Sequence, residues 1–126
     1  MLNVSPLITI VPVIDMARAR DFYEHKLGLR PEGAQSDGSV IYSCGTALLE
    51  LYPKPGGTKA DHPIMSFEVF DIKSEIRALE HKGILFKDAD QPDFKTVGHV
   101  VKIGDEKEAW FKDSEGNVLC LHQTLH

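Results

Sequence analysis

One carboxylate stands where it could do chemistry. Glu50 interrupts the apolar run of residues 47–51, whose other members are alanine and leucine. An acid in an apolar wall is costly unless it is paired or hydrogen-bonded. Two roles for Glu50 follow. It is either a structural acid satisfied by a neighbouring strand, or a ligand acceptor or general base whose proton affinity is raised by desolvation.

Aromatic side chains near the candidate strands offer flat surfaces for recognition. Trp110 can stack on a flat or cationic ligand, because the face of an indole ring attracts positive charge. Tyr52 and Tyr42 are candidates for the same role. For each of the three, the alternative is an ordinary aromatic residue of the core.

The thiols and imidazoles give weaker signals. Cys44 and Cys120 are the two cysteines, too few for a disulfide framework in a chain of this length. Cys120 is either a buried, inert thiol or a ligand for a soft metal. His122 has the strand position expected of a pocket residue and His99 lies nearby in sequence, although solvated or packed imidazoles explain both.

Composition bounds the class of protein. The 126 residues suit one domain with one core, and the 42% apolar content is ordinary for a globular chain. The net charge of −5 argues against nucleic-acid binding, which needs a basic surface. No run approaches the ~20 apolar residues of a membrane helix, and no signal peptide is evident. We therefore expect no membrane association and a cytoplasmic location.

The chain contains an internal repeat, with residues 8–29 resembling residues 64–85 at an offset of 56 positions. The triplet Glu24-His25-Lys26 recurs identically as Glu80-His81-Lys82. Three further pairs keep the same offset: Ile8 with Ile64, Val13 with Val69, and Asp15 with Asp71. A duplicated structural unit explains this agreement better than chance does.

Each copy begins with an expected strand, residues 7–14 and 64–70, followed by an aspartate that can cap a helix. Gly28 and Gly83 are suited to end these helices. Further strands are expected at residues 40–43, 47–52, 97–103, 108–112 and 118–122. Residues 53–63 form a Pro/Gly linker and 87–98 a loop of the kind that often covers a site. The expected organisation is one domain over residues 1–126, with modules at approximately 4–53 and 64–123.

Four stretches carry a resemblance to a known family: VPVIDMARARDFYEHKLGL, LLELYP, SFEVFDI and AWFKDSEGNVLCL. With this layout the chain resembles the glyoxalase/bleomycin-resistance/dioxygenase family, the vicinal oxygen chelate superfamily. The resemblance implies an α+β fold in which paired βαβββ modules form a curved, partly closed mixed sheet around a concave pocket. It also implies a homodimer, because members often complete their pocket at a subunit interface.

In that fold the helices pack outside the sheet, so strand alternation assigns the side chains to faces. The expected core positions are Leu49, Leu51, Phe67, Val69, Phe111, Leu119 and Leu121. The expected pocket positions are Ile8, Ile10, Leu48, Glu50, Tyr52, Ser66, Glu68, Glu108, Trp110, Cys120 and His122. Tyr42 is added to this set as an aromatic ligand contact.

The family's metal-dependent members place one ligand on each of four strands. The resemblance maps these positions onto Ile8, Glu50, Ile64 and Cys120. Isoleucine has no lone pair, and a catalytic zinc site typically needs about three protein ligands. We therefore expect no metal and no cofactor, although a different set that recruits His122 or His99 stays open.

Three functions follow from these expectations. The first is a metal-free protein that binds a small molecule and sequesters a cationic or aromatic compound, as the resemblance to the bleomycin-resistance branch implies. The second is an enzyme, lactoylglutathione-lyase-like or dioxygenase-like, in which Glu50 acts as metal ligand or general base. The third is an interaction module with a vestigial pocket. The sequence favours the first and leaves open whether the chain is an enzyme.

Overall fold

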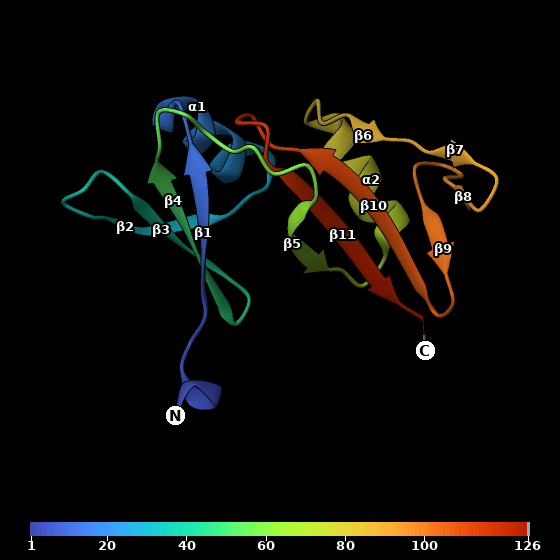
Figure 1. Ribbon diagram of the computed structural model, residues 1–126, viewed down its shortest axis with the longest axis horizontal. Coiled ribbons are helices and arrows are strands. Elements are labelled where there is room, and N and C mark those ends of the chain that lie inside the picture. Colours follow the sequence, from blue (N-terminus) through green and yellow to red (C-terminus); the bar gives the residue numbers. More distant parts are fainter. Residues whose placement is uncertain (126) are drawn as a thin grey trace. The chain divides into compact units, whose positions relative to one another are not determined.

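Each half of the chain folds around its own sheet in the computed structural model, which describes residues 1–125 (Figure 1). The predicted α+β class is confirmed. The chain divides into two compact units: Met1–Lys59 with Ser114–Gly116, and Ala60–Asp113 with the chain from Asn117 onward. In chain order the elements are η1 (Leu2–Val4), β1 (Ile8–Val13), α1 (Met16–Asp21), η2 (Phe22–Lys26), β2 (Arg30–Ala34), β3 (Val40–Cys44), β4 (Ala47–Pro53), β5 (Pro63–Glu68), α2 (Ile72–His81), β6 (Phe86–Lys87), β7 (Asp90–Gln91), β8 (Phe94–Lys95), β9 (Val101–Ile103), β10 (Glu106–Lys112) and β11 (Val118–Thr124).

The first unit contains a four-stranded mixed sheet in the order β1-β4-β3-β2. β1 runs parallel to β4, and the other pairs are antiparallel. The register places Ile10 and Ile41 on either side of Glu50. Side chains at these positions point to one face, and their neighbours along each strand point to the other.

The helix of the first unit begins where the sequence predicts. The Asp15 carboxylate accepts a hydrogen bond from the backbone N–H of Arg18 at 3.1 Å, which satisfies one orphan donor of α1. The helix then widens into the π-helical turn η2, which buries Phe22 and Tyr23. Gly28 follows with φ +78°, the left-handed conformation that glycine adopts without steric cost.

The second unit repeats this plan with a five-stranded sheet. Its order is β5-β11-β10-β6, with β9 also paired to β10, and β5 runs parallel to β11. Asp71 caps α2 by accepting from the N–H of Ser74 at 3.3 Å. Ile72, Ile76 and Leu79 are buried on the face of α2 that meets β10 and β11 (Figure 1). The three residues recur at the three- and four-residue spacing that places side chains on one face of a helix.

The turn between β10 and β11 is stabilised by its own polar residues. Asp113 Oδ1 accepts from the N–H of Asn117 at 2.8 Å, and Asn117 Nδ2 donates to Asp113 Oδ2 at the same distance. Gly116 has φ +87°. These two buried polar side chains therefore serve the local backbone.

Some elements differ from the sequence-based expectation. β2 was not predicted, and its five residues are all exposed. The segment predicted as loop 87–98 carries a short hairpin, β7–β8, and the strand expected at 97–103 is confined to Val101–Ile103. No helix within residues 1–125 is long and apolar enough to cross a membrane.

Candidate ligand-binding faces

The sheet of the second unit has one face that α2 does not cover. The register places Cys120 between Ser66 and Trp110 on this face. In the next row, His122 lies between Glu68 and Glu108. We call this surface, with Glu106 and Thr124 in the following row, the β10–β11 face.

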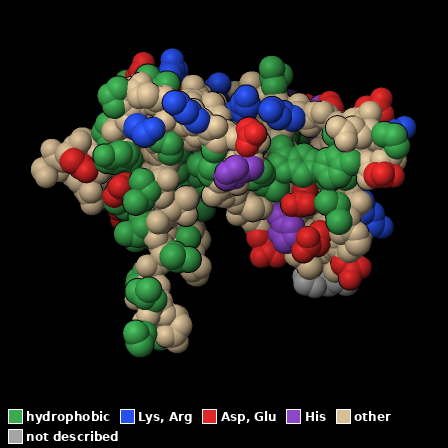
Figure 2. All heavy atoms as spheres, in the orientation of Figure 1, with side chains coloured by type: hydrophobic (Ala, Val, Ile, Leu, Met, Phe, Trp, Pro, Cys, Tyr) green, Lys and Arg blue, Asp and Glu red, His purple; other side chains and the backbone are tan. Residues whose placement is uncertain are grey.

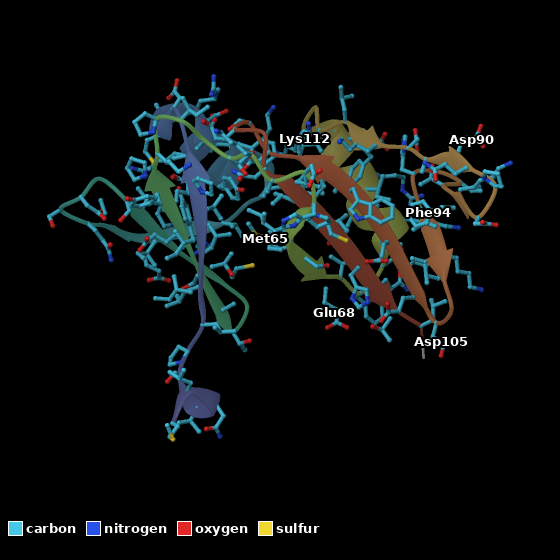
Figure 3. All side chains as sticks on the ribbon, viewed as in Figure 1. Met65, Glu68, Asp90, Phe94, Asp105 and Lys112 are labelled. Carbon is cyan, nitrogen blue, oxygen red and sulfur yellow. The ribbon has the colours of Figure 1, made fainter. Side chains whose placement is uncertain are left out.

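An aromatic pair lies at one side of the β10–β11 face. The rings of Trp110 and Phe94 have their centroids 5.4 Å apart and are tilted by 37°. Phe94 reaches this position from β8, within the short hairpin (Figure 3). Trp110 is half-buried, so part of its indole remains accessible. The pair is a flat apolar surface of the kind on which an aromatic compound stacks.

Acidic side chains occupy the rest of this face. Glu106 and Glu108 lie two residues apart on β10, and Glu68 lies on β5, separated from Glu108 by His122 of β11. His122 Nε2 is 3.1 Å from Glu106 Oε1, and the hydroxyl of Thr124 donates to Glu68 Oε1 at 3.4 Å. Figure 2 shows acidic and histidine side chains gathered beside hydrophobic ones on this part of the molecule.

An open cavity adjoins the end of the β10–β11 face that carries Glu68 and Thr124. It has a volume of about 580 Å³ and includes Glu68, Asp71 and Thr124 in its wall. Phe70, which is 98% exposed, lies in the same wall. The β10–β11 face thus borders a space of the size that small molecules occupy.

Cys120 lies at the floor of the β10–β11 face and is buried. Its thiol donates to the carbonyl of Leu121 at 3.2 Å and approaches Glu108 Oε1 at 3.7 Å. Burial raises the pKa of this thiol, and the nearby Glu108 carboxylate raises it further. A protonated, enclosed thiol is a poor nucleophile and a poor metal ligand.

The open face of the first unit is mainly apolar. Three large apolar side chains are exposed on this face: Ile8 at 46%, Ile10 at 59% and Tyr52 at 42%. Leu48 and Glu50 lie beside them and are partly covered. Within residues 1–125, the Glu50 carboxylate has no hydrogen-bond or ion-pair partner. Glu50 is therefore free to accept a hydrogen bond from a bound molecule.

Tyr42 lies on the opposite face of the first sheet, which corrects its assignment as a ligand contact. It pairs with Leu49, points toward the helix side and is fully buried against Tyr23. Its hydroxyl donates to Glu24 Oε2 at 2.7 Å, and Glu24 in turn binds Arg20. Burial, followed by this hydrogen bond, raises the pKa of Tyr42 far above its ordinary value. Tyr42 is a core residue.

Comparison with known proteins identifies the family. The model of the Glyoxalase/Bleomycin resistance protein/Dioxygenase superfamily matches residues 6–121, nearly the whole chain. The chain belongs to this superfamily. The predicted glyoxalase fold is thereby confirmed. No curated protein matches the chain.

Solved structures of the glyoxalase fold agree with this assignment. A putative glyoxalase family protein from Bacillus anthracis is 17% identical, with a TM-score of 0.74 and coverage of 95% of this chain and 94% of the other. TnmS3, an antibiotic binding protein from Streptomyces sp. CB03234, is 21% identical, with a TM-score of 0.72 and 98% coverage of both chains. A lactoylglutathione lyase from Agrobacterium tumefaciens is 17% identical, with a TM-score of 0.71 and coverage of 95% and 93%. At these identities the similarity establishes the fold alone.

The positions that correspond to metal ligands in this superfamily do not form a suitable donor set. Ile8 and Ile64 offer no lone pair, and Cys120 is a buried thiol with a raised pKa. Glu50 alone supplies an oxygen. No group of three or more His, Cys, Asp or Glu side chains among residues 1–125 is placed to hold a metal ion. The residues present do not fit the superfamily's metal, and we derive no step through one.

Sequence reasoning missed Glu106 and Thr124 of the β10–β11 face, and Phe94 beside it. Glu106 lies two residues before Glu108 on the same strand, and alternation would have identified it had the strand been extended. Phe94 carries no such signal, because its contact with Trp110 joins a loop to a strand far along the chain. Ser66, Glu68, Trp110, Cys120 and His122, which were predicted together, do share this face.

Proposed function

We propose that this glyoxalase-superfamily chain binds a planar, cationic aromatic small molecule without a metal. The proposal rests on one arrangement, in which the Trp110–Phe94 pair lies beside the carboxylates of the β10–β11 face. Aromatic faces attract cations, and this attraction strengthens as water is excluded. The carboxylates supply the opposite charge, and the net charge of −5 favours the approach of a cation. TnmS3, which has a similar fold, is an antibiotic binding protein, and this supports the binding of a small molecule.

A thermal-shift assay with paired compounds tests the proposal. Each planar aromatic cation is matched with a neutral analogue of the same size, because a ligand that binds only the native state raises the melting temperature. The cations should stabilise the protein, and their neutral analogues should do so less. An unchanged melting temperature across the whole panel would remove this function.

Charge-neutralising variants locate the effect. Glu106→Gln and Glu108→Gln should each weaken the binding of the cation about two- to fivefold, in line with exposed charge pairs, and leave the neutral analogue unaffected. Glu75→Gln, at an exposed position of helix α2, is the matched control. Equal weakening by the control would mean that net charge, and not the β10–β11 face, governs binding.

A second candidate is a metal-free lyase or isomerase with Glu50 as general base. The observation that favours it is the unpartnered Glu50 carboxylate on the open face of the first unit. A carboxylate without an internal donor keeps its lone pairs available to accept a proton from a substrate. Isomerisation of a hemithioacetal to the α-hydroxy thioester, in which Glu50 would move a proton between the two carbons, should be abolished in Glu50→Gln; turnover unchanged in that variant would exclude Glu50 as the base.

We also propose a homodimer located in the cytoplasm, with the two units acting as one domain. The exposed apolar residues Ile8 and Ile10 support self-association, since burial of such area stabilises an interface. Cys44 and Cys120 are free thiols, as expected in a reducing compartment. Sedimentation should give a dimer for the natural protein and a monomer for Ile10→Lys. A monomeric natural protein would exclude the dimer.

A further inference from the structure

The segment that carries Phe94 leaves the second sheet and returns to it almost at the same point. Lys87 of β6 pairs with Trp110, and Val101 of β9 pairs with Glu108, two residues away on the same strand β10. Residues 88–100 between them form a compact excursion with closely spaced ends. Such an excursion can hold its tip in one place only if its base is fixed.

The base of the excursion is fixed by polar contacts across its two ends. The backbone N–H of Thr96 donates to the carbonyl of Ala89 at 2.9 Å, and the N–H of Ala89 donates to Thr96 Oγ1 at 3.1 Å. The Thr96 hydroxyl also lies 3.0 Å from Asp88 Oδ1. Hydrogen bonds among Asp88, Ala89 and Thr96 thus hold the two ends of the excursion together.

His99 joins this base to the rest of the unit. Its Nδ1 donates to Asp88 Oδ1 at 2.9 Å, and its Nε2 lies 3.4 Å from Glu80 Oε2 on α2. The imidazole also stacks on Phe86 of β6, with centroids 6.0 Å apart and planes at 28°. The hydrogen bond from His99, followed by that from Thr96, lowers the pKa of Asp88. Asp88 therefore remains a charged acceptor.

The backbone conformation at His99 is one that glycine adopts more easily than histidine does. His99 has φ +69°, the single positive φ outside glycine among residues 1–125, and it directly follows Gly98 with φ +59°. A second glycine would adopt this conformation at no steric cost, whereas histidine is strained there. The contacts of the imidazole with Asp88, Glu80 and Phe86 offset that strain.

We infer that His99 is a positioning residue, which fixes the hairpin so that Phe94 packs against Trp110. This inference rests on the proposed function, because the aromatic pair is the surface assigned to the ligand. His99 itself lies outside the β10–β11 face and acts through the hairpin. It sets how much of the indole is available to a planar molecule.

The test uses the full chain without any ligand. Trp110 is the only tryptophan, so its fluorescence and its quenching by acrylamide report directly on Phe94. Phe94→Ala removes the cover from one side of the indole and defines the fully released signal. His99→Asn keeps a residue that tolerates positive φ but removes the imidazole, which contacts Asp88, Glu80 and Phe86. His81→Asn is the matched control, because His81 is exposed on α2 and has no side-chain partner among residues 1–125.

Phe94→Ala should raise the quenching constant of Trp110, and His99→Asn should give most of the same increase while His81→Asn gives none. His99→Gly, which also relieves the backbone strain, should behave like His99→Asn with an unchanged circular dichroism spectrum. Quenching in His99→Asn equal to that of the natural protein would overturn the inference, as would a Phe94→Ala variant without effect. A ligand panel without a hit would remove the proposed function and leave this fluorescence result intact, so the two failures are distinguishable.

Discussion

The two units of the chain share a plan but use their carboxylates differently. In the first unit, Glu24 and Glu115 are turned inward and bound by arginine and by backbone or tyrosine donors. In the second unit, Glu106 and Glu108 stand on an open sheet face beside an aromatic pair. Glu50 of the first unit is the exception, since it lies on an open face without an internal partner. The comparison shows that one duplicated fold can place acidic residues either inside, as bound acceptors, or on an open sheet face.

Glu115 is the most enclosed of these acids. Its Oε1 accepts from the backbone N–H groups of Ile14 and Asp15 at 2.9 and 2.8 Å. Arg18 donates through Nε to Oε2 at 2.8 Å and through Nη2 to Oε1 at 3.1 Å. Burial by itself would raise the pKa of Glu115, but the hydrogen bonds from Arg18, Asp15, Ser114 and Ile14 outweigh it and lower the pKa to about 2.

The largest expected effect follows from neutralising that acid. Glu115→Gln should lower the free energy of unfolding by about 3 kcal/mol, because hydrogen bonds to a charged acceptor are lost and Arg18 meets an amide N–H. Urea denaturation measures this change. Glu108→Gln, on the open face of the second unit, should stay within about 0.5 kcal/mol of the natural protein. Similar losses in both variants would contradict the contrast between the units.

Acid should act through the same residue. A carboxylate whose folded pKa is depressed contributes its full stability above its ordinary pKa of 4.5, and that contribution disappears as the pH falls toward 2. The difference in unfolding free energy between the natural protein and Glu115→Gln should therefore shrink between these pH values. Denaturation at a series of pH values checks this, and a constant difference would mean that Glu115 does not titrate as the contacts require.

Removal of the indole should weaken ligand binding. Trp110→Ala should weaken the affinity for a planar cation by about 2 kcal/mol, or about thirtyfold in Kd, because a desolvated cation–π contact is lost. Tyr52→Ala, on the open face of the first unit, should cause a smaller change. Titration calorimetry measures both. A larger loss for Tyr52→Ala would move the principal ligand surface to the first unit.

The smallest effect concerns the corrected residue. Tyr42→Phe should cost about 1 kcal/mol of stability, because one buried hydrogen bond to Glu24 is lost, and it should leave ligand affinity unchanged. Thermal unfolding and calorimetry on the same sample separate the two outcomes. An altered Kd at unchanged stability would return Tyr42 to the ligand surface.

Local patterns predicted most of the helices and strands. Asp15 and Asp71 cap the helices that they were expected to cap. β2 escaped because Pro31 and Gly33 depart from a strand pattern and no face of it is buried. The π-helical turn after α1 also has no simple sequence signal.

The site was predictable only where alternation along a strand decides it. The positions Ser66, Trp110 and Cys120 follow from strand parity, and the register aligns them. Tyr42 was selected for its aromatic ring, and the register instead pairs it with Leu49 of the core. The contacts of Glu115 with Arg18 and of Phe94 with Trp110 depend on tertiary structure, which local patterns do not report.

The short turn Ser114–Gly116 belongs to the first unit although both strands that flank it belong to the second. A peptide of residues 1–59 made alone would lack the carboxylate that accepts from Ile14, Asp15 and Arg18 at the start of its helix. A cut in the linker would therefore leave the N-terminal fragment without this stabilising acceptor. In a split version of this protein, the C-terminal fragment would need to supply the turn Ser114–Gly116 to the N-terminal fragment.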